Sequence, residues 1–159
     1  MRLVHCFILL VFIISACHNF PRDPDKTLEK VKNGTLLVGY SENPPWVIKT
    51  NAAPTGLEAE LIKEFAQTQQ AKVIWVNDTE QDLFEKLEKQ ELHLVIGGIT
   101  DKNSWKSKIS FTRPYYQIPK EKHVMAVIKG ENAFTVALET FLHRQEANLP
   151  SRLQTYENR

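Results

Sequence analysis

Three short apolar runs, separated by two amphipathic patterns, are the feature that most constrains the fold of this chain. The runs Leu36–Tyr40, Val73–Val76 and Leu94–Ile96 are almost continuously apolar, which is typical of strands buried on both faces. Between them, residues 57–69 and 79–92 carry apolar side chains at helical spacing. Strand, helix, strand, helix, strand with short links predicts a parallel sheet with right-handed crossovers.

A fourth apolar run and a last helical pattern follow. The run is His123–Ile128, and the helix is expected to begin at Glu131 or Asn132. We therefore predict a three-layer α/β domain over residues 27–144, with a parallel or mixed sheet and flanking helices. Residues 145–159 are polar and interrupted by a proline, and are expected to form a loose tail.

The first residues of the chain are typical of an export signal. The apolar run Phe7–Ile14 is too short to span a bilayer, which requires about 20 apolar residues. The sequence Ile14–Cys17 is similar to a bacterial lipobox, so we expect a signal peptide over residues 1–16 and lipidation of Cys17. Residues 17–26 would then be a polar tether. The alternative is an ordinary signal cleaved before an incidental cysteine.

Composition excludes several classes of function. Cys6 lies in the expected signal and Cys17 would carry lipid, which leaves no cysteine for a disulfide framework or a cysteine-based metal site. The 20 basic and 19 acidic residues give no electrostatic argument for nucleic acid binding. The histidines lack metal-ligand spacing, and neither a nucleophile elbow nor a phosphate loop is present. We expect no catalysis, cofactor or metal.

Four short blocks in fixed order carry a family resemblance. They are LLVGYSENPPW (Leu36–Trp46), GLEAEL (Gly56–Leu61), LVIGGIT (Leu94–Thr100) and FTRPYY (Phe111–Tyr116). Together they resemble the bacterial extracellular solute-binding proteins of family 3, which serve amino-acid ABC importers. The resemblance implies a type II-like periplasmic-binding fold, in which a solute is trapped between two α/β lobes joined by a hinge.

One of those two lobes has no counterpart in this sequence. His123–Leu142 resembles the family segment that returns to the first lobe, yet only six residues separate it from Tyr116. We therefore expect a single lobe. The alternative is that His123–Leu142 begins a second lobe truncated by a shortened gene, which would expose unpaired strand edges and apolar helix faces.

Ligands of open α/β sheets bind beyond the carboxyl ends of the strands, where three loops of this chain qualify. Two of them, the loops after the first and the third strand, carry the candidate residues. In the first, two prolines would present Trp46 for stacking or cation–π contact, unless the ring only covers the edge of the core. In the second, Gly98 and Thr100 imply, by resemblance, a site for the α-amino and α-carboxylate groups of an amino acid. A tight strand exit is the alternative.

Two further positions bear on the ligand. The resemblance places Glu58 where an acid can meet the ligand ammonium, although an acid in a first helical turn is also favoured by the helix dipole. Trp105 stands five residues after Thr100, where the family commonly has an arginine that clamps the ligand carboxylate. Trp46 and Trp105 together would form an aromatic surface for an apolar or cationic ligand or for a protein partner.

These expectations combine into one leading hypothesis. The chain would be a lipid-anchored protein of the periplasm or cell envelope, resembling the substrate-binding component of an ABC transporter and binding an amino-acid-like small solute. Its partners would be the solute, the membrane through the lipid on Cys17, and a transporter subunit. The alternatives are a scaffold lipoprotein that contacts a transporter or envelope partner through its open crevice, and a degenerate enzyme of the dehydratase kind.

Overall fold

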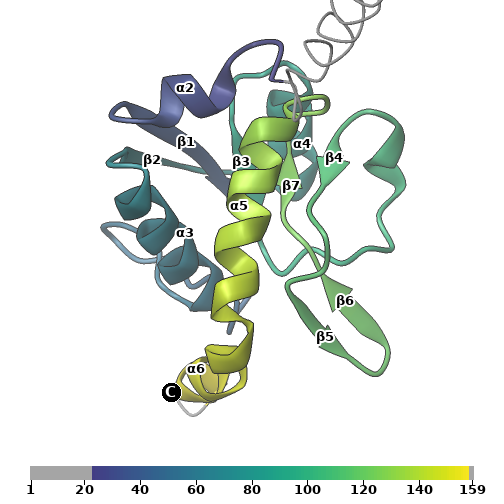
Figure 1. The fold of residues 1–159 in the computed structure, drawn as a ribbon. Helices are drawn as coiled ribbons and strands as arrows, with labels where there is room; N and C mark the ends of the chain where they lie inside the picture. Colours follow the sequence, from purple (N-terminus) through teal and green to yellow (C-terminus); the bar gives the residue numbers. More distant parts are fainter. Residues whose placement is uncertain (1–22, 158–159) are drawn as a thin grey trace, which may run out of the picture.

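A mixed five-stranded sheet lies at the centre of the computed structural model, which describes residues 23–157 (Figure 1). Its strand order is β2-β1-β3-β7-β4. The predicted parallel strands are β1 (Thr35–Tyr40), β2 (Lys72–Asn77) and β3 (Leu94–Ile96), and all three run parallel. Two short strands complete the sheet, β4 (Ser110–Phe111) and β7 (Ala126–Val127), and β7 runs antiparallel to both of its neighbours, β3 and β4. The predicted α/β class is confirmed.

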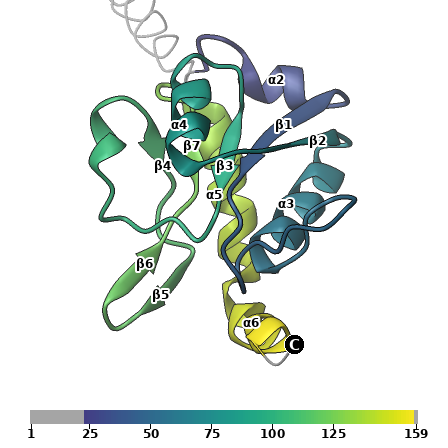
Figure 2. The same ribbon diagram turned by 180° about the vertical axis from the view of Figure 1, so that it is seen from behind.

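Helices cover both faces of the sheet (Figures 1 and 2). One face packs against α2 (Thr27–Val31), α3 (Leu57–Thr68), α5 (Asn132–Gln145) and α6 (Leu149–Glu157). The other face packs against α4 (Glu80–Glu88) and a short 3₁₀ helix at Ser104–Ser107. Successive residues of β1 alternate between the two layers, since Leu36 belongs to the first apolar cluster and Leu37 packs against the second.

A two-stranded hairpin extends from the main sheet. It consists of β5 (Tyr116–Ile118) and β6 (Glu121–His123), with Tyr116 paired to His123 (Figures 1 and 2). The sequence predicted one strand over His123–Ile128, but the structure divides this segment, because His123 ends β6 and β7 begins at Ala126. β7 lies between β3 and β4, so the chain re-enters the main sheet directly after the hairpin.

The C-terminal segment differs from the predicted loose tail. It forms a 3₁₀ turn at Glu146–Asn148 and then α6, whose buried residues are Leu149, Leu153 and Tyr156. Pro150 is compatible with this helix because it lies in the first turn, where a backbone N–H has no helical acceptor. The prediction failed because it treated this proline as a helix breaker and overlooked apolar residues at helical spacing.

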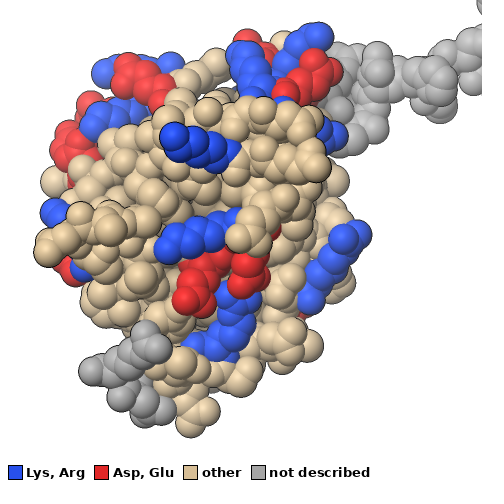
Figure 3. Space-filling model, turned by 90° about the vertical axis from the view of Figure 1, so that its left-hand side faces the viewer, with Lys and Arg blue, Asp and Glu red and all other residues tan. Residues whose placement is uncertain are grey.

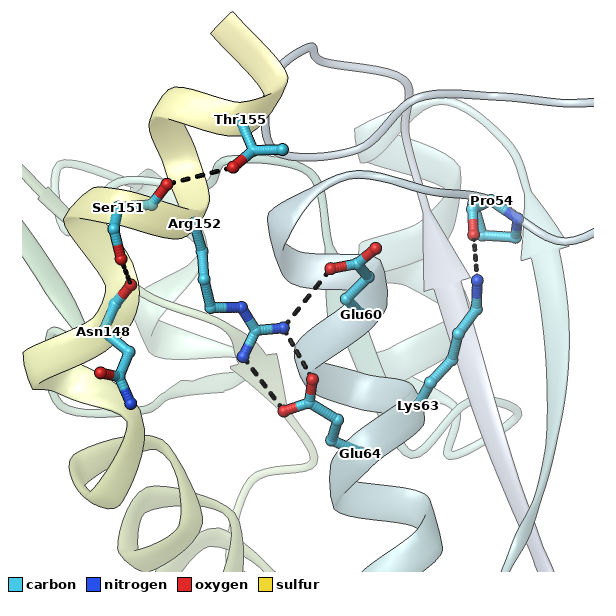
Figure 4. Close-up of polar contacts among 8 residues, drawn as sticks. All are labelled: Pro54, Glu60, Lys63, Glu64, Asn148, Ser151, Arg152 and Thr155. Carbon is cyan, nitrogen blue, oxygen red and sulfur yellow. Dashed lines mark hydrogen bonds and ion pairs between the residues drawn. The ribbon is translucent and has the colours of Figure 1, made fainter.

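Polar contacts join α6 to α3 (Figure 4). The two terminal nitrogens of Arg152 donate to the carboxylate of Glu64 over 3.1 and 2.8 Å, and one of them lies 3.5 Å from Glu60. On the side of the molecule drawn in Figure 3, acidic and basic side chains lie next to one another. Among residues 23–157, no helix is both long and apolar enough to cross a membrane. The expected signal peptide and the lipidation of Cys17 fall outside the described residues.

Candidate functional site

The carboxyl ends of β1 and β3 lie side by side, and each continues into a predicted site loop. Tyr40 pairs with Ile96 at the ends of the two strands. The loops that follow are linked by the side chain of Asn43, whose Nδ2 donates to the carbonyl oxygen of Gly97 over 2.8 Å. Parallel strand order therefore brings the two loops together, as the sequence predicted.

Glu58 is buried and fixes the glycine loop to α3. Its Oε2 accepts hydrogen bonds from the backbone N–H groups of Gly97 (2.7 Å) and Gly98 (2.9 Å), and its Oε1 accepts one from the Tyr115 hydroxyl. Burial raises the pKa of Glu58, and these three hydrogen bonds oppose the rise. The Glu58 carboxylate is therefore buried, and protein groups donate hydrogen bonds to both of its oxygens.

Gly98 is required by both conformation and space. Its φ of 66° lies in the left-handed region, which favours glycine. A Cβ at this position would lie 2.5 Å from Cδ1 of Trp46 and 2.6 Å from Nδ2 of Asn43. The glycine loop and the Trp46 indole are therefore packed directly against one another.

Trp46 is held by its backbone and covered by other rings. Its N–H donates to the carbonyl oxygen of Asn43 over 2.9 Å, and its carbonyl oxygen accepts from the N–H of Glu58 over 3.0 Å. The imidazole of His123 stacks on the indole with 3.9 Å between ring centroids and 29° between planes. Tyr116 approaches edge-on at 5.6 Å. Only 9% of Trp46 is exposed, and the ring belongs to the apolar cluster on the α3 face of the sheet.

His123 is the site residue that sequence reasoning missed. The residue is 3% exposed, and neither Nδ1 nor Nε2 has a hydrogen-bond partner among the described residues. Burial lowers the pKa of His123, an effect that the Glu121 carboxylate, 3.8 Å from Nε2, opposes. The sequence shows only a histidine without metal-ligand spacing. The β5–β6 hairpin brings His123 onto Trp46. The sequence offered one signal for this hairpin, the short segment of six residues between Tyr116 and His123.

The other two predicted site residues, Thr100 and Trp105, lie in different parts of the structure. Thr100 lies beside the ring stack, because it forms an isolated antiparallel bridge with His123. Trp105 lies in the other apolar layer, where its ring is 5.7 Å from that of Phe84 and 5.1 Å from Nζ of Lys108. Trp46 belongs to the layer that contains α3. The expected joint surface of Trp46 and Trp105 is therefore wrong, because the two rings pack on different faces of the sheet.

The result is a small constellation at one end of the sheet. We call Trp46, Glu58, Gly97 and Gly98 the Trp46 platform. The hairpin residue His123 covers this platform, and the backbone of Thr100 is paired with His123. The aromatic face of Trp46 could stack on a planar group of a solute only if the His123 ring were not there.

Known proteins share this sequence pattern and fold. A probable histidine-binding protein of Campylobacter jejuni is 26% identical over 102 residues, which are 64% of this chain and 40% of that protein. The arginine-bound form of domain 1 from TmArgBP, the ArgBP from T. maritima, is 25% identical with a TM-score of 0.66, over 73% of this chain and 97% of the domain. An ancestral amino-acid-binding protein, described as a precursor of cyclohexadienyl dehydratase, shares the fold at 16% identity and a TM-score of 0.70, over 80% of this chain and 99% of that one.

The family assignment rests on most of the chain. This chain spans less than half the length of the curated relative, but nearly all of a single domain of TmArgBP. The model of the family described as bacterial extracellular solute-binding proteins, family 3, matches residues 36–152, which include the four sequence blocks and the first turn of α6. This chain belongs to the bacterial extracellular solute-binding proteins, family 3.

Proposed function

We propose that this chain is a one-lobed solute-binding domain that holds a small amino-acid-like solute at the carboxyl ends of β1 and β3. The observation that carries the proposal is the Trp46 platform, in which Glu58 fixes the Gly97–Gly98 loop against the indole. Fixed backbone and a fixed aromatic face reduce the ordering cost of binding. The arginine-bound form of domain 1 from TmArgBP supports the idea that a single domain of this family can hold an amino acid.

A single lobe changes the expected affinity. The β5–β6 hairpin stands where the family resemblance would place a second lobe, so a solute here would be enclosed from one side only. Good binding sites enclose about 70–90% of the ligand surface. The position where the family commonly has a carboxylate-clamping arginine holds Trp105, whose ring packs against Phe84 on the other face of the sheet. We therefore expect binding in the micromolar-to-millimolar range, corresponding to about 4–8 kcal/mol.

The cellular setting follows from the N-terminal sequence. Export by residues 1–16 and lipidation of Cys17 would place the platform in the periplasm or cell envelope, tethered to a membrane by residues 17–26. A membrane-bound transporter subunit is the proposed partner, because the tether would keep the domain close to it.

Calorimetry and thermal unfolding of residues 23–159 test the proposal. Arginine, histidine, lysine, glutamate and putrescine are titrated to 10 mM, and at least one amino acid is expected to raise the melting temperature by a few degrees, because it binds only the folded state. Trp46→Ala should abolish this shift. Trp75→Ala is the matched control, since Trp75 lies on β2 with its ring 6.1 Å from that of Tyr40.

Each outcome is compared with the same variant without solute, so a general loss of stability does not count as a loss of binding. If no solute shifts the wild-type melting temperature, the proposal is wrong. Recovery of a transporter or envelope protein by cross-linking would then favour the scaffold hypothesis.

A further inference from the structure

We propose that His123 is an internal occupant of the Trp46 platform, which a solute with a planar imidazole or guanidinium group must displace in order to bind. This inference rests on the proposed function. It assigns to the β5–β6 hairpin a regulatory role at the same site, and it names the chemical class of the solute.

The first argument is the geometry of the stack. The His123 ring lies 3.9 Å from the Trp46 ring at 29°, and the two residues are 3% and 9% exposed. A planar solute group cannot occupy that indole face while the imidazole remains there. Either His123 leaves, or the predicted stacking surface is unavailable.

The second argument is that the polar neighbours of the His123 imidazole, which are the Glu121 carboxylate 3.8 Å from Nε2 and the Gly98 backbone, do not satisfy its nitrogens. Among the described residues, neither ring nitrogen of His123 has a hydrogen-bond partner, although both atoms are buried. A buried polar group without partners loses its hydration and gains nothing in exchange. When the ring moves into water, both nitrogens recover hydrogen bonds, and this gain offsets part of the stacking that is lost.

The third argument is the difference in support between the two partners. The Trp46 backbone donates to Asn43 and accepts from Glu58, and the glycine loop packs against the indole. The His123 backbone is also held, because its carbonyl oxygen accepts from the N–H of Tyr115 over 3.0 Å and His123 forms an isolated bridge with Thr100. Its imidazole nitrogens, in contrast, have no hydrogen-bond partner among the described residues. Displacement should therefore rotate the His123 side chain and leave the indole in place.

The solute class follows from what would compete best for the same face. An indole face attracts cations more strongly than neutral rings, and burial lowers the pKa of His123, which disfavours its charged form. The Glu121 carboxylate, 3.8 Å from Nε2 of His123, would lie close to a cation placed there, and its side chain is 52% exposed. A guanidinium or imidazolium group is planar, similar in size to the displaced ring, and positively charged.

The test is to remove the internal occupant. His123→Ala should bind arginine or histidine about tenfold more tightly than the wild type, because no population is lost to the occupied state. Imidazole and methylguanidinium at 10 mM should raise the melting temperature of His123→Ala by a few degrees and leave that of the wild type nearly unchanged. His143→Ala is the control, because that side chain is 79% exposed.

A second variant covers the case in which His123→Ala folds poorly. His123→Phe retains a stacked ring but has no nitrogen to rehydrate, so it should bind arginine about tenfold more weakly than the wild type. The inference is overturned if both variants bind arginine with wild-type affinity, or if imidazole stabilises His123→Ala while no amino acid binds it more tightly. Amino-acid binding by the wild type would still support the proposed function, so the two proposals fail separately.

Discussion

The Trp46 platform and the β5–β6 hairpin meet in one ring stack, but they are held in opposite ways. On the platform, a buried carboxylate accepts three hydrogen bonds, and the glycine loop touches the indole. On the hairpin, the backbone of His123 is held by Tyr115 and Thr100, but its buried imidazole has no hydrogen-bond partner among residues 23–157. We therefore expect the Trp46 platform to stay fixed when a solute binds, and the His123 side chain to move.

The largest expected effect comes from removing the acceptor at the centre of the platform. Glu58→Ala leaves the N–H groups of Gly97 and Gly98 and the Tyr115 hydroxyl without their acceptor. Each buried unsatisfied donor costs about 1–3 kcal/mol, so the free energy of unfolding should fall by about 3 kcal/mol or more in urea denaturation.

The control for this change is Glu60→Ala, on the same helix. Its carboxylate is 44% exposed and lies 3.5 Å from Arg152, so the loss should stay below about 1 kcal/mol. Equal losses for the two variants would show that the platform is no more firmly held than the protein surface.

The next effect tests whether the C-terminal helix supports the platform. Leu153 of α6 is 6% exposed, and α6 packs against α3, which carries Glu58. Leu153→Ala should lower the free energy of unfolding by about 2–3 kcal/mol through the cavity that it creates. Thr155→Ala, on an exposed position of the same helix, should change it by less than about 0.5 kcal/mol. A negligible effect of Leu153→Ala would mean that the segment is the loose tail expected from sequence.

A smaller effect should appear in the pH dependence of stability. Burial lowers the pKa of His123 below its usual value of 6.5, so the unfolded chain binds more protons than the folded chain just below that pH. The free energy of unfolding should therefore fall as the pH drops through 6.5. The Glu121 carboxylate, 3.8 Å from Nε2 of His123, should make this decrease smaller.

Urea denaturation at pH 7.5 and 5.5 measures this loss in the wild type and in His123→Gln, where it should be smaller. His93 has a pKa lowered by burial as well, so His93→Gln serves as the comparison. If His123→Gln loses as much stability between pH 7.5 and 5.5 as the wild type, the imidazole must be solvated or hydrogen-bonded in solution, and the His123 side chain is not the unsatisfied group described above.

The two regions also differ in how well the sequence predicts them. The parallel strands and the positions of Trp46, Gly98 and Thr100 at one sheet edge follow from local patterns, because parallel topology fixes where strand ends meet. The role of Glu58 required the structure, since its hydrogen-bond donors, the Gly97 and Gly98 N–H groups and the Tyr115 hydroxyl, are 39, 40 and 57 residues away in the sequence. Likewise, Trp105 packs on the opposite face of the sheet from Trp46 because its 3₁₀ helix covers that face. The spacing of residues in the sequence does not show which face a short helix will cover.

The smallest effect concerns the hairpin itself. Ile118 on β5 is 39% exposed, whereas Ile96 on β3 is fully buried. Ile118→Ala should change the free energy of unfolding by less than about 0.5 kcal/mol, as is usual for surface positions, while Ile96→Ala should lower it by about 2–5 kcal/mol. Urea denaturation of the two variants compares the same substitution in the two regions. A loss above about 1 kcal/mol at Ile118 would mean that the hairpin folds cooperatively with the sheet, and an easily displaced His123 would then be untenable.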